Sequence, residues 1–368
     1  MPHIPRRPWS RITSAVIVAL LLPVFWSVGH ALTMTGGGTV SERLAEWARD
    51  HYLGPVVTFG EWLTYQPPKV GGKPSFALTG PSAQVKKLPK AVTYGPPQRL
   101  TSMAGRPLAG EGSWRVLATA GGQPAIYGTY LRPSSVYTSY VAGIASINQS
   151  LVRFELRPGI EDPGPGNWHA ASSIVPGTRQ GLLATFNSGF KIASSGGGFY
   201  LNGVTRGALT PGVAAMVYYR DGHIAIGTWG QGLGMTPDVA AVRQNLHLIV
   251  ANGQVPGSVD ANVETSWGAT LGGGYYVWRS GIGVTSDGRV IFVYGPALNV
   301  REIAELLRRA GVVNGMELDI NPAWMSFMYY LNGQSANPKP VALLPTQANA
   351  PDRYYYPSSR DFTAVYAK

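Results

Sequence analysis

Two carboxylates stand two residues apart near the C-terminal end of the chain. Glu317 and Asp319 belong to a run of alternating apolar and polar residues from Gly315 to Trp324. As a β-strand, this run puts Glu317, Asp319 and Asn321 on one face, with neighbours on that face roughly 6.5–7 Å apart. Adjacent carboxylates raise each other's pKa, so that one can act as an acid while the other stays ionised. The pair is a candidate for acid/base cleavage of a glycosidic bond, and the alternative is a polar strand face that meets solvent or an arginine.

Arg279 is a second candidate for chemistry. On a strand its side chain shares a face with Gly281 and Gly283, which carry no side chains to compete for the space. A guanidinium presents a planar fork of donors that suits phosphate or carboxylate. We therefore expect Arg279 either to bind an anionic group of a ligand or to form a salt bridge to an acid such as Asp319.

Asn187 ends an apolar segment and is followed directly by Ser188-Gly189-Phe190. An amide at a strand end can orient a hydroxyl or hold a backbone group, and glycine lets a ligand approach the main chain. The alternative is that Asn187 only caps a turn. Trp324, beside the acids, is expected either in the core or stacked on a sugar face.

The elements that must position these residues are mostly strands. Pairs of Asn-Gly or Asp-Gly separate apolar runs and predict antiparallel hairpins. They stand at Asn202-Gly203, Asp221-Gly222, Asn252-Gly253 and Asp287-Gly288. A capping box from Asn299 to Glu302 predicts a helix that ends at Gly311. The fold class is therefore α+β, with a large, mostly antiparallel sheet and a few helices.

Composition excludes several classes of site. The chain has no cysteine, which removes disulfides, thiolate metal sites and cysteine nucleophiles. Its six histidines are scattered, so a divalent cation would need oxygen ligands; no metal and no cofactor is indicated. The glycine-rich runs lack the Lys-Ser/Thr of a phosphate-cradling loop. A formal charge of +11 suits a polyanionic partner or simply solubility, and no nucleic-acid module is present.

The N-terminal segment predicts membrane attachment. Arg6, Arg7 and Arg11 precede an uncharged apolar stretch from Ile12 to Val28, which predicts an N-terminus inside and the remainder outside. Its length favours a signal anchor of residues 1–33 over a cleaved signal peptide. We expect residues 34–112 to form an amphipathic helix at 41–52 and a Pro/Gly-rich stem, irregular from Pro55 to about Gly112, and residues 113–368 to form one domain.

The order of the motifs resembles the phosphodiester glycosidase family, which includes the lysosomal uncovering enzyme and many bacterial envelope proteins. The matching segments are Asn187-Ser-Gly-Phe190, Arg279-Ser-Gly-Ile-Gly-Val-Thr-Ser-Asp-Gly288 and Glu317-Leu-Asp319. The resemblance covers roughly residues 114–368. The chain departs from the family after Asp319, where Ile-Asn-Pro-Ala-Trp replaces a glycine-rich loop, and it looks like the bacterial, membrane-attached branch.

This resemblance implies an extracytoplasmic hydrolase that removes a sugar linked through its anomeric carbon to a phosphodiester. Arg279 would bind the phosphate, Asp319 and Glu317 would supply acid/base or electrostatic roles, and Asn187 would orient sugar or water. Other residues expected to contact substrate are Ser280, Gly189, Phe190, Asn321 and Trp324. The alternative is a non-catalytic envelope protein that binds an anionic phosphoglycan or a protein partner through the same cleft.

Overall fold

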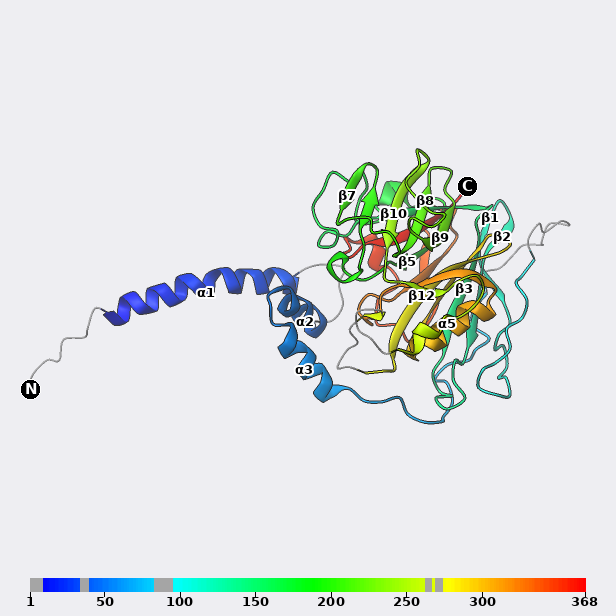
Figure 1. Cartoon of the computed structure of the whole chain (residues 1–368), viewed down its shortest axis with the longest axis horizontal. Helices are drawn as coiled ribbons and strands as arrows, with labels where there is room; N and C mark the ends of the chain where they lie inside the picture. The colour runs from blue at the N-terminus through cyan, green and yellow to red at the C-terminus, as the bar shows by residue number, and fades with distance from the viewer. Residues whose placement is uncertain (1–8, 34–39, 83–94, 262–266, 269–273) are drawn as a thin grey trace, which may run out of the picture.

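The computed structural model describes residues 9–33, 40–82, 95–261, 267–268 and 274–368. A long helix projects away from a compact body, and two short helices lie between them (Figure 1). The helices are α1 (Trp9–Thr33), α2 (Val40–Asp50), α3 (Gly54–Thr64) and α5 (Val300–Arg309). Short 3-10 helices cover Pro176–Thr178, Ile192–Ser194, Gly257–Asp260 and Arg353–Tyr355.

The strands of the described residues form three sheets in which every pair of neighbours is antiparallel. The large sheet has the order β1 (Arg115–Ala120), β2 (Gln123–Leu131), β3 (Ala142–Asn148), β13 (Arg289–Leu298), β12 (Val277–Thr285), β14 (Val312–Glu317), β11 (Leu248–Val250). The second sheet has the order β7 (Val204–Arg206), β6 (Phe199–Leu201), β10 (Val239–Gln244), β8 (Ala214–Tyr219), β9 (Ile224–Thr228). The third, here the β5 sheet, has the order β16 (Lys339–Ala342), β15 (Phe327–Leu331), β5 (Leu182–Asn187), β17 (Phe362–Ala367), β4 (Val152–Arg157). This architecture confirms the predicted fold class, with the strands divided among three sheets.

The main core lies between the large sheet and the β5 sheet. Phe292 of β13 packs against Phe186 of β5 and Phe327 of β15, with ring centroids 4.9 and 5.3 Å apart. All three rings are fully buried, which removes a large apolar area from water. This core therefore holds the ends of β5 and β12, which carry Asn187 and Arg279, in fixed relation to each other.

Three of the four predicted hairpins are present, at residues 202–203, 221–222 and 287–288. Asn252-Gly253 instead turns within an isolated bridge between Ala251 and Gln254, because β11 pairs with β14 rather than with the next segment. The capping box is also present: the backbone N–H of Glu302 donates to Asn299 Oδ1, and the backbone N–H of Asn299 donates to Glu302 Oε2. Helix α5 covers the face of the large sheet that is turned away from the main core.

The N-terminal region contains one predicted helix and one that was not predicted. Helix α2 coincides with the amphipathic segment at 41–52, whereas α3 occupies a stretch that was expected to be irregular from Pro55 onward. Proline is compatible with the first turn of a helix, where its missing N–H has no partner in any case, and Pro55 stands there. Within the described residues, α1 is the one helix long and apolar enough to cross a membrane. Arg6 and Arg7 lie outside the described residues.

Candidate active site

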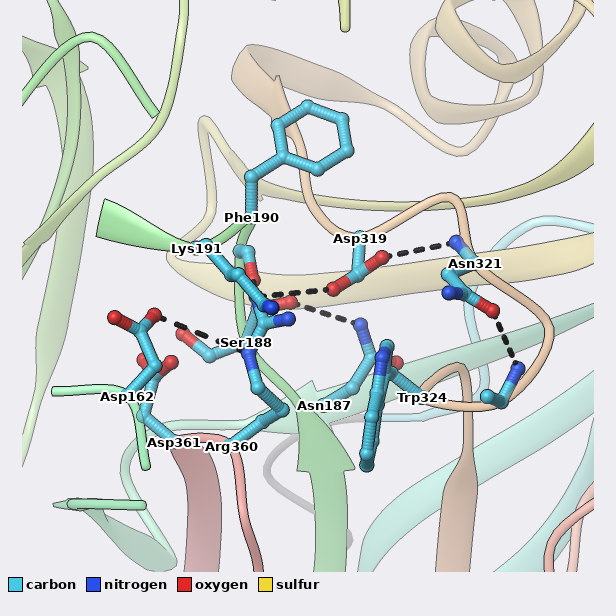
Figure 2. Close-up of polar contacts among 12 residues, drawn as sticks. Asp162, Asn187, Ser188, Phe190, Lys191, Asp319, Asn321, Trp324, Arg360 and Asp361 are labelled. Atoms are coloured by element: carbon cyan, nitrogen blue, oxygen red, sulfur yellow. Dashed lines mark hydrogen bonds and ion pairs between the residues drawn. The ribbon is translucent and has the colours of Figure 1, made fainter. Parts of the chain in front are cut away.

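A cavity of about 440 Å³ lies where the N-terminal helices meet the body, and its volume is typical of a small-molecule site. The body contributes Phe190, Lys191, Ala193, Ser194, Gly268, Asp319, Ile320, Asn321, Trp324 and Arg360. Helices α2 and α3 contribute Glu46, Arg49, Asp50, Thr58 and Glu61. Figure 2 shows the Asp319 carboxylate between Asn321 on one side and the Arg360 side chain on the other.

Asp319 is held two residues beyond the end of β14. The Ser280 amide and hydroxyl both donate to the Asp319 carbonyl oxygen, at 3.1 and 2.7 Å, and the Leu318 amide donates to the Ser280 carbonyl at 2.8 Å. The backbone N–H of Asn321 donates to Asp319 Oδ1 at 2.9 Å. These bonds extend the ladder between β12 and β14, so the carboxylate keeps one position at the cavity wall with 3% of the residue exposed.

Arg360, which sequence reasoning missed, is the cation beside Asp319. Its Nη2 lies 3.5 Å from Asp319 Oδ2 and donates to the Gly189 carbonyl at 3.4 Å, and its Nε lies 3.8 Å from Asp162 Oδ2. The guanidinium also lies 5.7 Å from the centre of the Trp324 ring. Arg360 and Asp361 directly precede the apolar strand β17, and two charged residues at this point were the signal available in the sequence.

The environment of Asp319 favours its protonated form. Burial raises its pKa to about 6, although the Arg360 charge and the Asn321 amide act in the opposite direction. A carboxyl group with such a pKa can accept or release a proton close to neutral pH. Asp319 is thus the carboxylate of this cavity whose titration suits proton transfer.

Asn187 lies behind the cavity, where it joins three segments of the body. Its Nδ2 donates to Ser280 Oγ and to the Ser188 carbonyl, both at 2.9 Å, and its Oδ1 accepts from the Ser326 amide at 3.0 Å. Ser280 in turn holds the Asp319 carbonyl. The amide is therefore satisfied by protein groups, and Asn187 and Ser280 position Asp319 through hydrogen bonds.

The turn after Asn187 is shaped by buried polar residues. A Cβ at Gly189 would come within 2.9 Å of the Asn245 side chain, whose Oδ1 accepts from the Phe190 amide at 3.1 Å. Arg243 donates to the Phe190 carbonyl and pairs with Asp361 at 2.7 Å, and both charged groups are buried. These contacts explain why glycine is required at 189 and how Phe190 reaches the cavity wall.

Arg279 and Glu317 form a sealed pair away from the cavity. Arg279 Nη1 donates to Glu317 Oε1 at 2.5 Å, and its Nε donates to the Leu298 carbonyl at 3.0 Å. Arg279 is 1% exposed and Glu317 is 0% exposed. Their positions differ from those predicted for a phosphate ligand and a catalytic acid, because neither side chain lines the cavity.

The glycines beside Arg279 explain this difference. A Cβ on Gly281 would come within 3.2 Å of the Ile303 and Leu307 side chains of helix α5. The cleared strand face thus admits the close packing of a helix rather than a ligand. Because α5 covers that face, the predicted salt bridge of Arg279 forms with Glu317 and not with Asp319.

Lys191 brings a second cation to the cavity, opposite acids from α2. Its Nζ lies 2.6 Å from both Glu46 Oε2 and Asp50 Oδ1. Asn321 Nδ2 also donates to Glu46 Oε1 at 3.3 Å. Burial opposes ionisation of Glu46, but the charges of Lys191 and Arg360 outweigh it and lower the Glu46 pKa. An anionic carboxylate is therefore already stabilised between Lys191 and Asn321.

The structure divides the predicted site residues into three groups. Those at the cavity wall are Asp319, Asn321, Trp324 and Phe190. Those directly behind it are Asn187, Ser280 and Gly189, and those sealed elsewhere are Arg279 and Glu317. Among the described residues, no group of three His, Asp or Glu side chains is arranged to hold a metal ion.

Comparison with known proteins gives one family match. Residues 180–319 match the phosphodiester glycosidase family, and this range contains all three motifs on which the resemblance rested. The resemblance is thus confirmed, together with the glycosidase-type hydrolase that it implied. A search of curated proteins found no match.

Three solved structures show distant similarity. One is the zebrafish N-acetylglucosamine-1-phosphodiester alpha-N-acetylglucosaminidase catalytic domain auto-inhibited by its pro-peptide, at 15% identity and a TM-score of 0.41 over 70% of this chain and 88% of that one. A hypothetical protein from Synechocystis is 12% identical, with a TM-score of 0.35 over 69% of this chain and 65% of that one. A putative exported protein from Burkholderia pseudomallei is 13% identical, with a TM-score of 0.29 over 62% and 74%.

Proposed function

We propose, on the premise that residues 180–319 form a phosphodiester glycosidase domain, that this hydrolase cleaves glycosyl phosphodiesters outside the cytoplasm. The bond broken joins the anomeric carbon of a sugar to a phosphate oxygen. The observation that carries the proposal is the placement of Asp319 beside Arg360 in a cavity that Lys191 also lines. A carboxylate that titrates near neutrality is thereby combined with two cations.

Two cations of the cavity, Arg360 and Lys191, would bind the phosphate group of the substrate. A phosphodiester carries one negative charge and accepts charge-assisted hydrogen bonds from Arg and Lys. We assign phosphate binding to Arg360 and Lys191 in place of Arg279, which α5 seals in the core. Lys191 is paired with Glu46 and Asp50 in this structure, so a bound phosphate would exchange with those carboxylates.

Asp319 would act as the base. It takes a proton from a water molecule whose oxygen forms a bond to the anomeric carbon, while the bond from that carbon to the phosphate oxygen breaks. The electron pair leaves with the phosphate, and the products are the free sugar and a phosphomonoester. A phosphate oxygen is a good leaving group, so one carboxylate suffices here, in contrast with the two needed for ordinary glycosides. The proposed reaction uses no cofactor.

Trp324 and Asn321 would hold the sugar. Both line the cavity next to Asp319, and an indole ring presents an apolar face that a sugar ring can cover. These two residues replace the glycine-rich loop that relatives carry after the corresponding aspartate. The sugar would thus be held by side chains rather than by backbone amides.

The proposed location follows from helix α1. Its apolar side chains are exposed rather than packed on the body, and basic residues precede it in the sequence. This pattern supports a membrane anchor with the N-terminus inside and the hydrolase outside.

The test is release of sugar from a glycosyl phosphodiester by the full chain in detergent. We expect Asp319→Asn to lower the rate by about 10²–10⁴-fold, as for loss of a general base. Asp238→Asn, which alters an exposed carboxylate outside the cavity, is the matched control and should keep the wild-type rate. Equal rates for wild type and Asp319→Asn would overturn the proposed function. Ligand binding without any sugar release would point to the non-catalytic binding protein instead.

A further inference from the structure

Helix α3 exposes its apolar side chains to the surroundings. Val56, Phe59, Trp62 and Leu63 are 67, 60, 61 and 63% exposed, and the Phe59 and Trp62 rings stack with centroids 6.0 Å apart. Residues three and four apart lie on one side of a helix, so these four side chains form one apolar face. None of the residues of α3 is buried.

The polar side of the same helix is turned toward the protein. Glu61 pairs with Arg49 of α2, and Thr58 and Glu61 line the cavity. The Tyr65 hydroxyl, just after the helix, donates to the Tyr276 carbonyl of the body at 3.3 Å. In water the opposite orientation is favoured, with apolar side chains packed inward. An apolar face held outward by polar contacts therefore needs a partner that is not water.

The position of α3 identifies that partner. Trp47 Nε1 of α2 donates to Ser27 Oγ of α1 at 2.9 Å, and Arg43 donates to the Leu32 carbonyl at 2.8 Å. These bonds hold α2, and α3 after it, at the C-terminal end of the apolar segment Ala15–Thr33. In Figure 1, α3 runs across the direction of α1 at that end. If α1 crosses a bilayer, α3 lies where the bilayer surface would be.

We propose that α3 is an interfacial helix whose apolar face rests on the bilayer, and that the cavity it borders takes a glycosyl phosphodiester carried by a lipid. Trp, Phe and Leu on one helix face are typical of such helices, and Trp is favoured at the membrane interface. The lipid would stay in the bilayer while its sugar phosphate reaches Asp319 past Thr58 and Glu61. The substrate part rests on the proposed function, whereas contact of α3 with lipid does not.

The first experiment measures contact with lipid and needs no activity. The chain has no cysteine, so Phe59→Cys can be labelled at one site with an environment-sensitive fluorophore. The full chain is reconstituted in phosphatidylethanolamine and phosphatidylglycerol vesicles that contain lipids with a quencher on the acyl chain. We expect strong quenching at position 59 and weak quenching for Thr58→Cys, which lies on the cavity side of the same helix. Equal and weak quenching at both positions, or shielding of position 59 only where two copies of the chain associate, would overturn the inference.

The second experiment separates the two substrates. Phe59→Ser with Trp62→Ser should lower hydrolysis of a lipid-linked glycosyl phosphodiester in vesicles by about tenfold or more, since membrane binding scales with buried apolar area. The same variant should hydrolyse a water-soluble, short-chain analogue at the wild-type rate. Met235→Ser, which removes another exposed apolar side chain outside α3 and outside the cavity lining, should alter neither rate. Equal loss on both substrates, or no loss on either, contradicts a lipid-borne substrate. Wild-type inactivity on both substrates overturns the proposed function instead, and the quenching result then still decides the role of α3.

Discussion

Two of the arginine–carboxylate pairs in the body of this protein differ in their surroundings. Arg279 and Glu317 contact each other at 2.5 Å beneath helix α5, whereas Arg360 and Asp319 are 3.5 Å apart at the wall of a cavity. Both pairs are almost completely buried. The first is close enough to neutralise its charges within the core. The second is looser and has room for a ligand, so burial alone does not distinguish a structural pair from a functional one.

Breaking the sealed pair should have the largest effect, and it should fall on stability. Arg279→Met leaves the Glu317 carboxylate buried without its cation, which costs about 3–5 kcal/mol of unfolding free energy. Denaturant unfolding of the purified chain measures this loss. Adding Glu317→Leu to that variant removes the unpaired charge and should restore much of the stability. If Arg279→Met folds with wild-type stability yet fails to bind substrate, Arg279 is a ligand after all, and the comparison of the pairs is wrong.

Breaking the pair at the cavity wall, Arg360 and Asp319, should affect catalysis instead. Arg360→Gln removes a charge-assisted contact to the phosphate, worth about 1.5–3 kcal/mol, so we expect KM to rise by about 10- to 150-fold. It also removes the cation that lowers the pKa of Asp319, so the pH profile should move to higher pH. Steady-state kinetics across pH test both effects. Arg206→Gln, a change to an arginine outside the cavity, is the control. A lower kcat with unchanged KM and pH profile would contradict phosphate binding by Arg360.

The pH dependence of activity and of stability should both reflect the titration of Asp319 in the pair at the cavity wall. Asp319 must be ionised to act as a base, and its pKa is raised from 3.8 to about 6. The value of kcat/KM should therefore fall about tenfold for each pH unit below that pKa. Stability should change in the opposite sense: because the folded state binds the proton more tightly, the contribution of Asp319 is fully present below pH 3.8 and is lost as pH rises through about 6. Asp319→Asn should remove this part of the pH dependence in thermal unfolding. An activity that rises as pH falls would instead make Asp319 the acid.

The smallest effect is expected where α2 meets the cavity. Glu46→Gln removes one of the two carboxylates that compete with phosphate for Lys191. Partly exposed ion pairs are typically worth about 0.2–1 kcal/mol, so KM should fall by no more than about fivefold. Glu305→Gln, which changes an acid that pairs with Arg308 and Arg309 outside the cavity, serves as the matched control. An increase in KM for Glu46→Gln would show that this carboxylate helps to bind substrate.

Much of the fold was predictable because it depends on short-range rules. The Asn-Gly and Asp-Gly turns predicted three real hairpins, since these residues accept the backbone angles of tight turns. The capping box at Asn299 predicted the start of α5 for a similar local reason. Helix α3 was missed because the segment from Pro55 to about Gly112 is rich in Pro, Gly and Lys and shows little periodicity, although proline is favoured in the first turn of a helix.

By itself, the sequence determined the local elements, the apolar N-terminal segment and the family motifs, and it identified Asp319 as a candidate catalytic residue. All of these depend on residues close together in the chain. Only the tertiary structure decided which cation would face that carboxylate. Strand alternation placed Glu317 and Asp319 on one face, but helix α5 covers that face at Glu317, while the strand ends before Asp319 and leaves it at a cavity. Arg360 joins Asp319 from 41 residues further along the chain, through the packing of the β5 sheet, and Lys191 joins through a turn that buried Arg243 holds. Such contacts depend on how separate elements pack, which short-range sequence patterns do not specify.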